Sequence, residues 1–329
     1  MKKLSLPVIT RRLRLIVTGS LNHLLFAMLL RKRFKAENAI VICGSIRSGS
    51  TWLAEMLSAL DHHIQLFEPL HPKYVKEVKK HIPSPNWYVA PDEAWPEGET
   101  LFRRILAGRL VNPWILSQVK PGELPAAKQL VIKFVRANLM LPWLSRLDGL
   151  RAPVLVIRHP CGVISSQLNK QWPPGKQLLL SNPYLDNYPE LRSACQSLSE
   201  PEELAALAWC LRYHAPLFSP APQRFVLVSY EALVRNGAAE LKRIYNAWGE
   251  TVPAAAEAQI AQPSDTSTKD SMIRQGKDPL AGWKHKLTDT QITNILNVLK
   301  IFGMEFYSEA LEPDYQALRK FGCSNNHDQ

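Results

Sequence analysis

A short loop of small and hydroxyl-bearing residues, GSIRSG at positions 44–49, has the composition of an anion-binding turn. The apolar, β-branched run at 39–43 predicts a buried strand of the parallel type. The apolar spacing of residues 50–57 predicts a helix directly after the loop. At such a junction free backbone N–H groups and the helix dipole point at one spot, which favours a bound anion. A turn without a ligand is the alternative.

The loop departs from the nucleotide-triphosphatase pattern G-x-x-x-x-G-K-[ST] at one position. Gly44 and Gly49 have the required spacing and Thr51 supplies the hydroxyl, but Ser50 stands where the lysine belongs. Arg47 is the cation that the loop itself carries. Without the lysine the loop should neutralise the end of a triphosphate poorly. One 5′-phosphate beside a transferable group suits Arg47 better.

A second arginine ends another predicted strand. The apolar run 153–157 leads into Arg158, and Ser166 follows eight residues later in a predicted helix. These two side chains can converge on one phosphate, because a guanidinium offers paired donors. A surface ion pair is the alternative for Arg158.

A carboxylate stands at the same edge of the predicted sheet. Ile64, Leu66 and Phe67 predict a second strand, and Glu68 ends it. In a doubly wound sheet this carboxyl edge is where ligands bind. Pro69 disfavours the right-handed helical region for Glu68, so the carboxylate should leave the strand near the loop. A solvated loop residue is the alternative.

Together these residues resemble the sulfotransferases that use 3′-phosphoadenosine 5′-phosphosulfate (PAPS). In that family the 5′-phosphosulfate loop reads as a basic residue, Ser, Gly, two hydroxyl residues and an aromatic. The matching residues here are Arg47, Ser48, Gly49, Ser50, Thr51 and Trp52. Arg158 and Ser166 match the ends of the family's 3′-phosphate motif, R-x-P-R-x-x-x-x-S. Two positions depart from it, since His159 replaces the usual Asp and Cys161 the second Arg.

The resemblance also implies catalytic roles. The sequence Phe-Glu-Pro around Glu68 resembles the segment after the phosphosulfate loop in carbohydrate-type members of the family, in which this Glu is placed to act as the base. Arg47 would stabilise the leaving 5′-phosphate. Cytosolic members carry a catalytic histidine two residues after a strand lysine, and here Val135 occupies that position after Lys133. His71 and Lys133 remain rivals to Glu68 for the proton.

Two further segments resemble parts of the cofactor site. Tyr230 begins a turn similar to the family's Y-E-D-L, whose tyrosine lies against adenine, and Trp52 would complete a sandwich. A core tyrosine is the alternative. Arg274 and Gly276 resemble the C-terminal segment that closes over the 3′-phosphate.

The resemblance implies a P-loop-type parallel sheet flanked by helices, in a single domain with helical and loop insertions. The implied reaction moves a sulfuryl group from PAPS to an acceptor hydroxyl, expected to belong to a carbohydrate or glycolipid, and needs no metal. A P-loop nucleotide kinase or NTPase is one alternative. A non-catalytic peripheral membrane protein that binds anions is another. The acceptor and the oligomeric state do not follow from the sequence.

The composition of the chain limits the kinds of partner that are expected. The net charge of +11 and pI of about 9.4 suit anionic ligands. Basic runs with interleaved aromatics are absent from the sequence, so nucleic acid is not an expected partner. Five scattered cysteines without C-x-x-C spacing indicate a reducing compartment, and the expected location is cytoplasmic.

The chain divides into three parts by composition. Residues 1–36 predict a basic, partly amphipathic helix, whose apolar stretch at 15–30 is shorter than the roughly 20 residues that span a bilayer. We expect at most peripheral contact with the inner membrane face through residues 1–35. Residues 37–310 form the predicted catalytic domain, and 311–329 a C-terminal tail. A proline-rich region at about 73–128 predicts an insertion outside the core, whose aromatics stack on an acceptor or anchor the insertion.

Overall fold

A computed structural model describes most of the chain. The described residues are 6–29, 34–60, 62–84, 86–168, 175–222, 224–262, 264 and 278–321.

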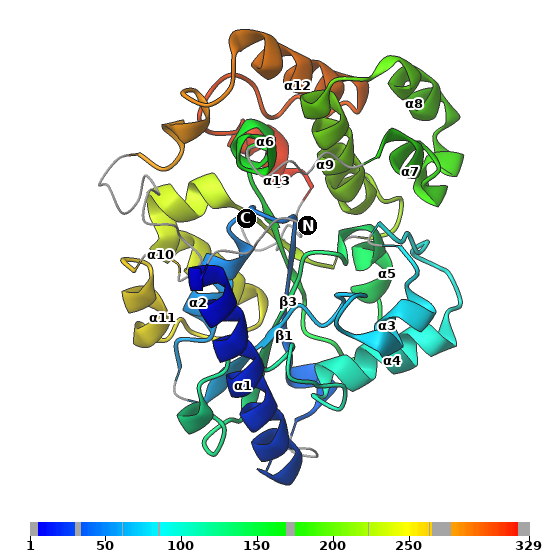
Figure 1. The fold of residues 1–329 in the computed structure, drawn as a ribbon. Coiled ribbons are helices and arrows are strands. Elements are labelled where there is room, and N and C mark those ends of the chain that lie inside the picture. Colours follow the sequence, from blue (N-terminus) through cyan, green and yellow to red (C-terminus); the bar gives the residue numbers. More distant parts are fainter. Residues whose placement is uncertain are drawn as a thin grey trace.

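Five parallel strands form one sheet, in the order β2-β3-β1-β4-β5 (Figure 1). Their bounds are β1 Ile40–Gly44, β2 His63–Phe67, β3 Gln129–Phe134, β4 Val154–Ile157 and β5 Val226–Ser229. From β1 the chain crosses to the edge strand β2, returns to β3 beside β1, and then passes to β4 and β5 on the other side of β1. The ends of β1, β3 and β4 therefore flank the crevice where such sheets bind ligands. The predicted fold class and all five predicted strands are confirmed.

Alternate residues of the strands supply two separate cores. Ile40 and Ile42 of β1 join one core, whereas Val41 and Cys43 join the other. The first core is covered by α2 Ser50–Leu57, α10 Tyr230–Ala247 and α11 Ala254–Gln259. Helices that contribute to the second are α1 Leu6–Leu29, α3 Lys76–His81, α4 Pro96–Leu106, α5 Leu141–Leu144, α6 Pro160–Leu168, α7 Lys176–Leu180, α9 Pro201–Leu217, α12 Asp289–Ile301 and α13 Tyr315–Arg319. The short α8, Pro189–Ala194, buries no residue.

The region 73–128 does not lie outside the core, and that expectation is wrong. Phe102 and Ile105 of α4 are fully buried, as are Ile115 and Leu116 in the segment that follows. The many prolines and charges hide a regular apolar face on α4, because they occupy its exposed side. Its aromatics pack against the domain; the Trp95 ring lies 5.2 Å from that of Trp143.

One predicted boundary shifts and another is confirmed. Tyr230 and Glu231, expected at the end of a strand, instead begin α10, and the Ser229 hydroxyl caps this helix by accepting the Ala232 N–H. The predicted capping box at Thr288 is confirmed, since its hydroxyl accepts the Gln291 N–H at the start of α12.

Candidate active site

Contacts with two tyrosines, Tyr230 and Tyr213, shape the loop after β1. Gly49 precedes α2 with φ of 90°, and a Cβ there would lie 2.3 Å from the Tyr230 ring. Glycine is therefore required both by the backbone and by the space. The Tyr213 hydroxyl fixes the start of the loop, because it accepts the Ser45 N–H at 3.1 Å and donates to the Val156 carbonyl at 2.9 Å.

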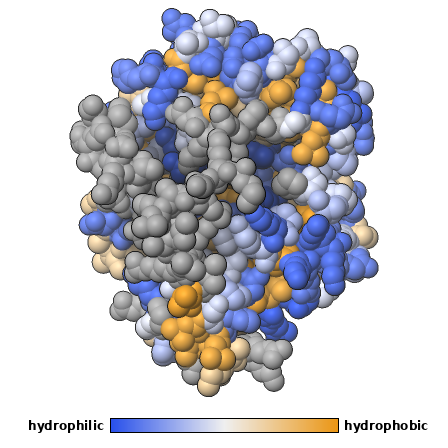
Figure 2. All heavy atoms as spheres, viewed as in Figure 1, coloured by the Kyte–Doolittle hydropathy of each residue, from blue (hydrophilic) through white to orange (hydrophobic). Residues whose placement is uncertain are grey.

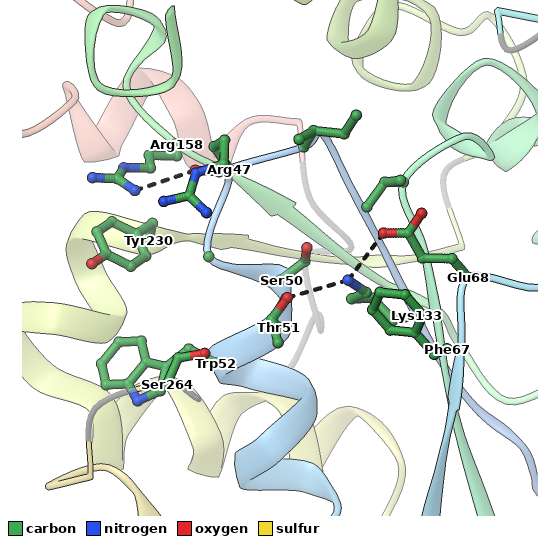
Figure 3. A pocket seen from close by; sticks show the side chains of 13 residues that line it. Arg47, Ser50, Thr51, Trp52, Phe67, Glu68, Lys133, Arg158, Tyr230 and Ser264 are labelled. Carbon is green, nitrogen blue, oxygen red and sulfur yellow. Dashed lines mark hydrogen bonds and ion pairs between the residues drawn. The ribbon is translucent and has the colours of Figure 1, made fainter. Parts of the chain in front are cut away.

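The arginines of the two predicted phosphate motifs meet at this loop (Figure 3). Arg47 Nε donates to Ser166 Oγ at 3.0 Å, and Arg158 donates to the Arg47 carbonyl at 3.2 Å. The Arg158 guanidinium also lies over the Tyr230 ring, 4.1 Å from its centre. Burial, then the neighbouring Arg158 charge, lower the pKa of Arg47. Among the described residues no carboxylate forms an ion pair with either arginine, although the buried Glu231 interacts with the Arg158 charge over a longer distance. Both guanidinium groups therefore remain available to an anion.

Glu68 and Lys133 face each other across the ends of β2 and β3. Lys133 Nζ lies 3.3 Å from Glu68 Oε1 and donates to Thr51 Oγ1 at 3.2 Å. Its side chain is 4% exposed, and burial lowers its pKa while Glu68 opposes the shift. Arg136 holds the other Glu68 oxygen at 2.8 Å. The carboxylate is thus held between two cations at the carboxyl edge of the sheet.

Arg47 and Glu68 share a backbone feature. Within the described part of the chain they are the only non-glycine residues with positive φ, at 74° and 42°. Each such conformation costs on the order of 1–3 kcal/mol and is found preferentially at functional sites. Two residues predicted to do chemistry therefore hold strained conformations on opposite sides of one cavity.

The cavity has a volume of about 220 Å³. Most predicted site residues line it, namely Arg47, Gly49, Ser50, Thr51, Trp52, Glu68, Arg158 and Tyr230. Ser166 reaches it through Arg47. The Ser48 side chain is fully buried and is not among the lining groups. Arg274 and Gly276 lie outside the described residues.

The predicted aromatic sandwich is not formed as a parallel pair. The rings of Trp52 and Tyr230 are 6.0 Å apart at 64°, in edge contact. Trp52 Nε1 donates to the Gln262 carbonyl, and Arg158 already covers one face of Tyr230. An adenine ring could stack on one of these rings but has no slot between them in this arrangement.

Sequence reasoning missed the group that supports Arg158 and Tyr230 from behind. The next residues, His159 and Glu231, are buried and joined, because Glu231 accepts the His159 N–H at 2.9 Å and the Tyr307 hydroxyl at 3.0 Å. The His159 ring stacks on Trp283 at 4.7 Å. His159, which replaces the Asp of the family's 3′-phosphate motif, therefore packs into the core and does not line the cavity.

Arg136 was also missed. It follows β3 by two residues, at the carboxyl edge of the sheet where ligands are expected, and that placement was the available signal.

No family model matches this chain, and no curated protein does. The sulfotransferase domain of an olefin synthase from Synechococcus PCC 7002 is 18% identical with a TM-score of 0.43, covering 83% of this chain and 95% of its own. The sulfotransferase domain from the curacin biosynthetic pathway is 15% identical with a TM-score of 0.43, covering 80% and 97%. A mouse sulfotransferase complexed with PAP is 13% identical with a TM-score of 0.44, covering 90% and 92%. At these values the likeness is one of general outline.

Proposed function

We propose that this chain is a PAPS-dependent sulfotransferase that sulfates a hydroxyl of a carbohydrate or glycolipid. The observation that carries the proposal is the meeting of Arg47, Arg158 and Ser166 at one anion-binding loop. The cavity places these donors at one end and the Lys133–Glu68 pair at the other. A nucleotide with two separate phosphate groups, one of them carrying the transferred group, fits this division.

The middle of the cavity, at the start of α2, would hold the 5′-phosphosulfate. Backbone N–H groups at the start of α2 would bind its oxygens, together with Thr51 and Lys133. Arg158 and Ser166 would bind the 3′-phosphate, and Tyr230 or Trp52 would stack on adenine. Arg274 and Gly276, which lie outside the described residues, keep the cofactor role that the resemblance implies.

Sulfuryl transfer should follow the in-line course of phosphoryl transfer, catalysed by positioning and charge stabilisation. The acceptor oxygen forms a bond to sulfur while the bond between sulfur and the 5′-phosphate oxygen breaks. Arg47 and Lys133 would stabilise the charge that develops on the leaving phosphate. Glu68 would take the acceptor proton, and Arg136 would hold the carboxylate in line.

The acceptor would approach from the side of Glu68. Tyr74 and Trp114 stack there at 4.0 Å, and the Phe67 ring, which lines the cavity, lies 5.2 Å from Trp114. Such aromatic faces offer the flat apolar contact that a sugar ring can use, with polar groups nearby. This supports the carbohydrate-type acceptor.

A nucleotide kinase or NTPase remains the second candidate, and one observation favours it. Lys133 Nζ reaches Thr51, so β3 supplies in space the cation that the loop lacks at Ser50. A triphosphate bound at the loop would therefore have a lysine nearby, although the loop sequence itself supplies none.

Transfer of label separates the two candidates. The chain would be incubated with ³⁵S-labelled PAPS and panels of glycan, glycolipid and phenol acceptors, and with γ-³²P-ATP in parallel. We expect ³⁵S in a glycan or glycolipid product and no ³²P transfer. Phosphate release or transfer without any sulfated product would favour the kinase or NTPase.

A further inference from the structure

Helix α1 presents an apolar stripe to the outside. In the described residues six large hydrophobic side chains are exposed, and four of them lie on this helix. They are Val17, Leu21, Leu24 and Met28, which are 66, 48, 59 and 73% exposed. Spacings of four, three and four residues put them on one face. Figure 2 shows the resulting apolar surface over the lower part of α1.

The opposite face of α1 is anchored to the domain. Asn22 is fully buried and donates from Nδ2 to the Leu116 carbonyl at 3.0 Å. Phe26 is also fully buried and stacks on Phe34 at 5.8 Å. A Cβ at Gly19 would lie 2.0 Å from the Pro113 carbonyl oxygen. The backbone of α1 therefore touches the backbone of the segment 113–119. These contacts fix the rotation of α1 and hold its stripe outward.

Most of the net positive charge of the protein comes from the stretch of sequence that contains this helix. Residues 1–36 contain nine of the 40 lysines and arginines and none of the 29 acidic residues. The other 293 residues therefore carry a net charge of only +2. The nine are Lys2, Lys3, Arg11, Arg12, Arg14, Arg31, Lys32, Arg33 and Lys35. They precede and follow the stripe in the sequence.

We propose that α1 lies in the plane of a membrane surface rich in anionic lipids, with its stripe in the acyl boundary. The apolar face and basic flanks match the requirements of an interfacial helix. Among the described helices none has the length and apolar character needed to cross a bilayer. A second copy of the chain is a poor occupant of the stripe, because it would bring another nine positive charges and no acid to the same place.

The position of α1 gives this docking a functional meaning, which rests on the proposed function. The helix packs on Pro113, Leu116 and Val119. The same segment carries Trp114, which contacts the cavity-lining Phe67. A membrane-bound enzyme would thus hold the acceptor side of its site close to the lipid surface, where a glycolipid hydroxyl is available.

Vesicle binding of the full chain tests the docking without PAPS or turnover, so its failure is distinct from failure of the proposed function. Flotation would use neutral phosphatidylcholine vesicles and vesicles containing phosphatidylglycerol. The test variant is Leu24→Glu with Met28→Glu, at two exposed positions. The matched control is Leu178→Glu, on an exposed leucine of α7 with the same 48% exposure as Leu21.

We expect binding to the anionic vesicles that weakens with added salt. The double variant should lower the partition coefficient by about tenfold or more, because two apolar side chains no longer enter the boundary. Arg31→Gln should lower it about fivefold, the usual worth of one basic residue near an anionic surface. Leu178→Glu should bind as the wild type does.

Three results would overturn the proposal. The first is equal binding of the double variant and the wild type, with circular dichroism showing both folded. The second is equal binding to neutral and anionic vesicles. The third is a dimer in light scattering that the double variant abolishes while vesicle binding stays absent, which would assign the stripe to a second copy.

Discussion

Lys133 Nζ donates a hydrogen bond to Thr51 Oγ1 at 3.2 Å, which joins the end of β3 to the first turn of α2. This contact brings a buried cation to the loop whose own lysine position holds Ser50. The same ammonium group lies 3.3 Å from Glu68. One side chain thus connects the proposed anion-binding end of the cavity with the candidate base.

Replacing Lys133 by Met should lower kcat by about 10²–10³-fold, the usual loss when one donor to a developing charge is removed. Methionine keeps the apolar stem against Phe67, which Lys133 Nζ overlies at 4.8 Å, so the change is chiefly one of charge. Steady-state kinetics measure the effect. Lys128→Met, at an exposed lysine just before β3, is the control and should be silent. Normal turnover in Lys133→Met would remove this lysine from the reaction.

Glu68→Gln should leave bisphosphate affinity nearly intact and lower kcat by about 10²–10⁴-fold, the range for a lost general base. Glutamine keeps the shape of the side chain but cannot take the proton. His71→Ala is the comparison, because burial, then the charge of Arg136, lower the pKa of His71 and favour its neutral form. A silent Glu68→Gln beside an inactive His71→Ala would transfer the base to His71.

Arg158→Ala should weaken binding of adenosine 3′,5′-bisphosphate by about 1.5–3 kcal/mol, the value of a charge-assisted contact. The effect on kcat should be smaller, because the 3′-phosphate is remote from the reacting sulfur. Calorimetry measures the affinity. Arg235→Ala provides the control, since that arginine pairs on the surface with Asp278 and Glu312. Equal affinities for the two variants would make Arg158 structural.

Acid should destabilise the fold through His159. Burial lowers the pKa of His159 to about 4, against an ordinary value of 6.5. Between these values the unfolded chain binds the proton and the folded chain does not, so stability rises with pH up to about 6.5 and falls as the pH drops toward 4. The contribution is about 3 kcal/mol across the window.

Urea unfolding of the wild type and His159→Gln at pH 7 and pH 4 isolates this contribution. Glutamine does not titrate, so the variant should lose less stability on acidification than the wild type does. Equal losses would show that His159 takes its proton in the folded state as readily as in the unfolded chain.

Much of the fold was predictable, because strands buried on both faces are apolar throughout. The runs at β1, β4 and β5 carry no polar residue that would confuse their assignment before Gly44 and Ser229. The region 73–128 was misjudged because α4 spaces its apolar residues among prolines and charges, and composition averages over that spacing.

The site was predictable where single residues stand at strand ends, as Arg47, Arg158 and Glu68 do. The site was not predictable where contacts between residues distant in the sequence determine the position of a side chain. The edge contact of Trp52 with Tyr230 depends on where the Gln262 carbonyl holds the indole. Arg136 follows β3 and pairs with Glu68 at the end of the neighbouring strand β2, and no local pattern in the sequence predicts that pairing.

The central claim is that the cavity takes a nucleotide with separate 3′ and 5′ anionic groups, without a metal to bind it. Isothermal titration calorimetry in EDTA, with adenosine 3′,5′-bisphosphate and with ATP, tests this most directly. The predicted result is tighter binding of the bisphosphate, with the preference lost in Arg158→Ala. Tighter binding of ATP, or a bisphosphate affinity that Arg158→Ala leaves unchanged, would contradict it.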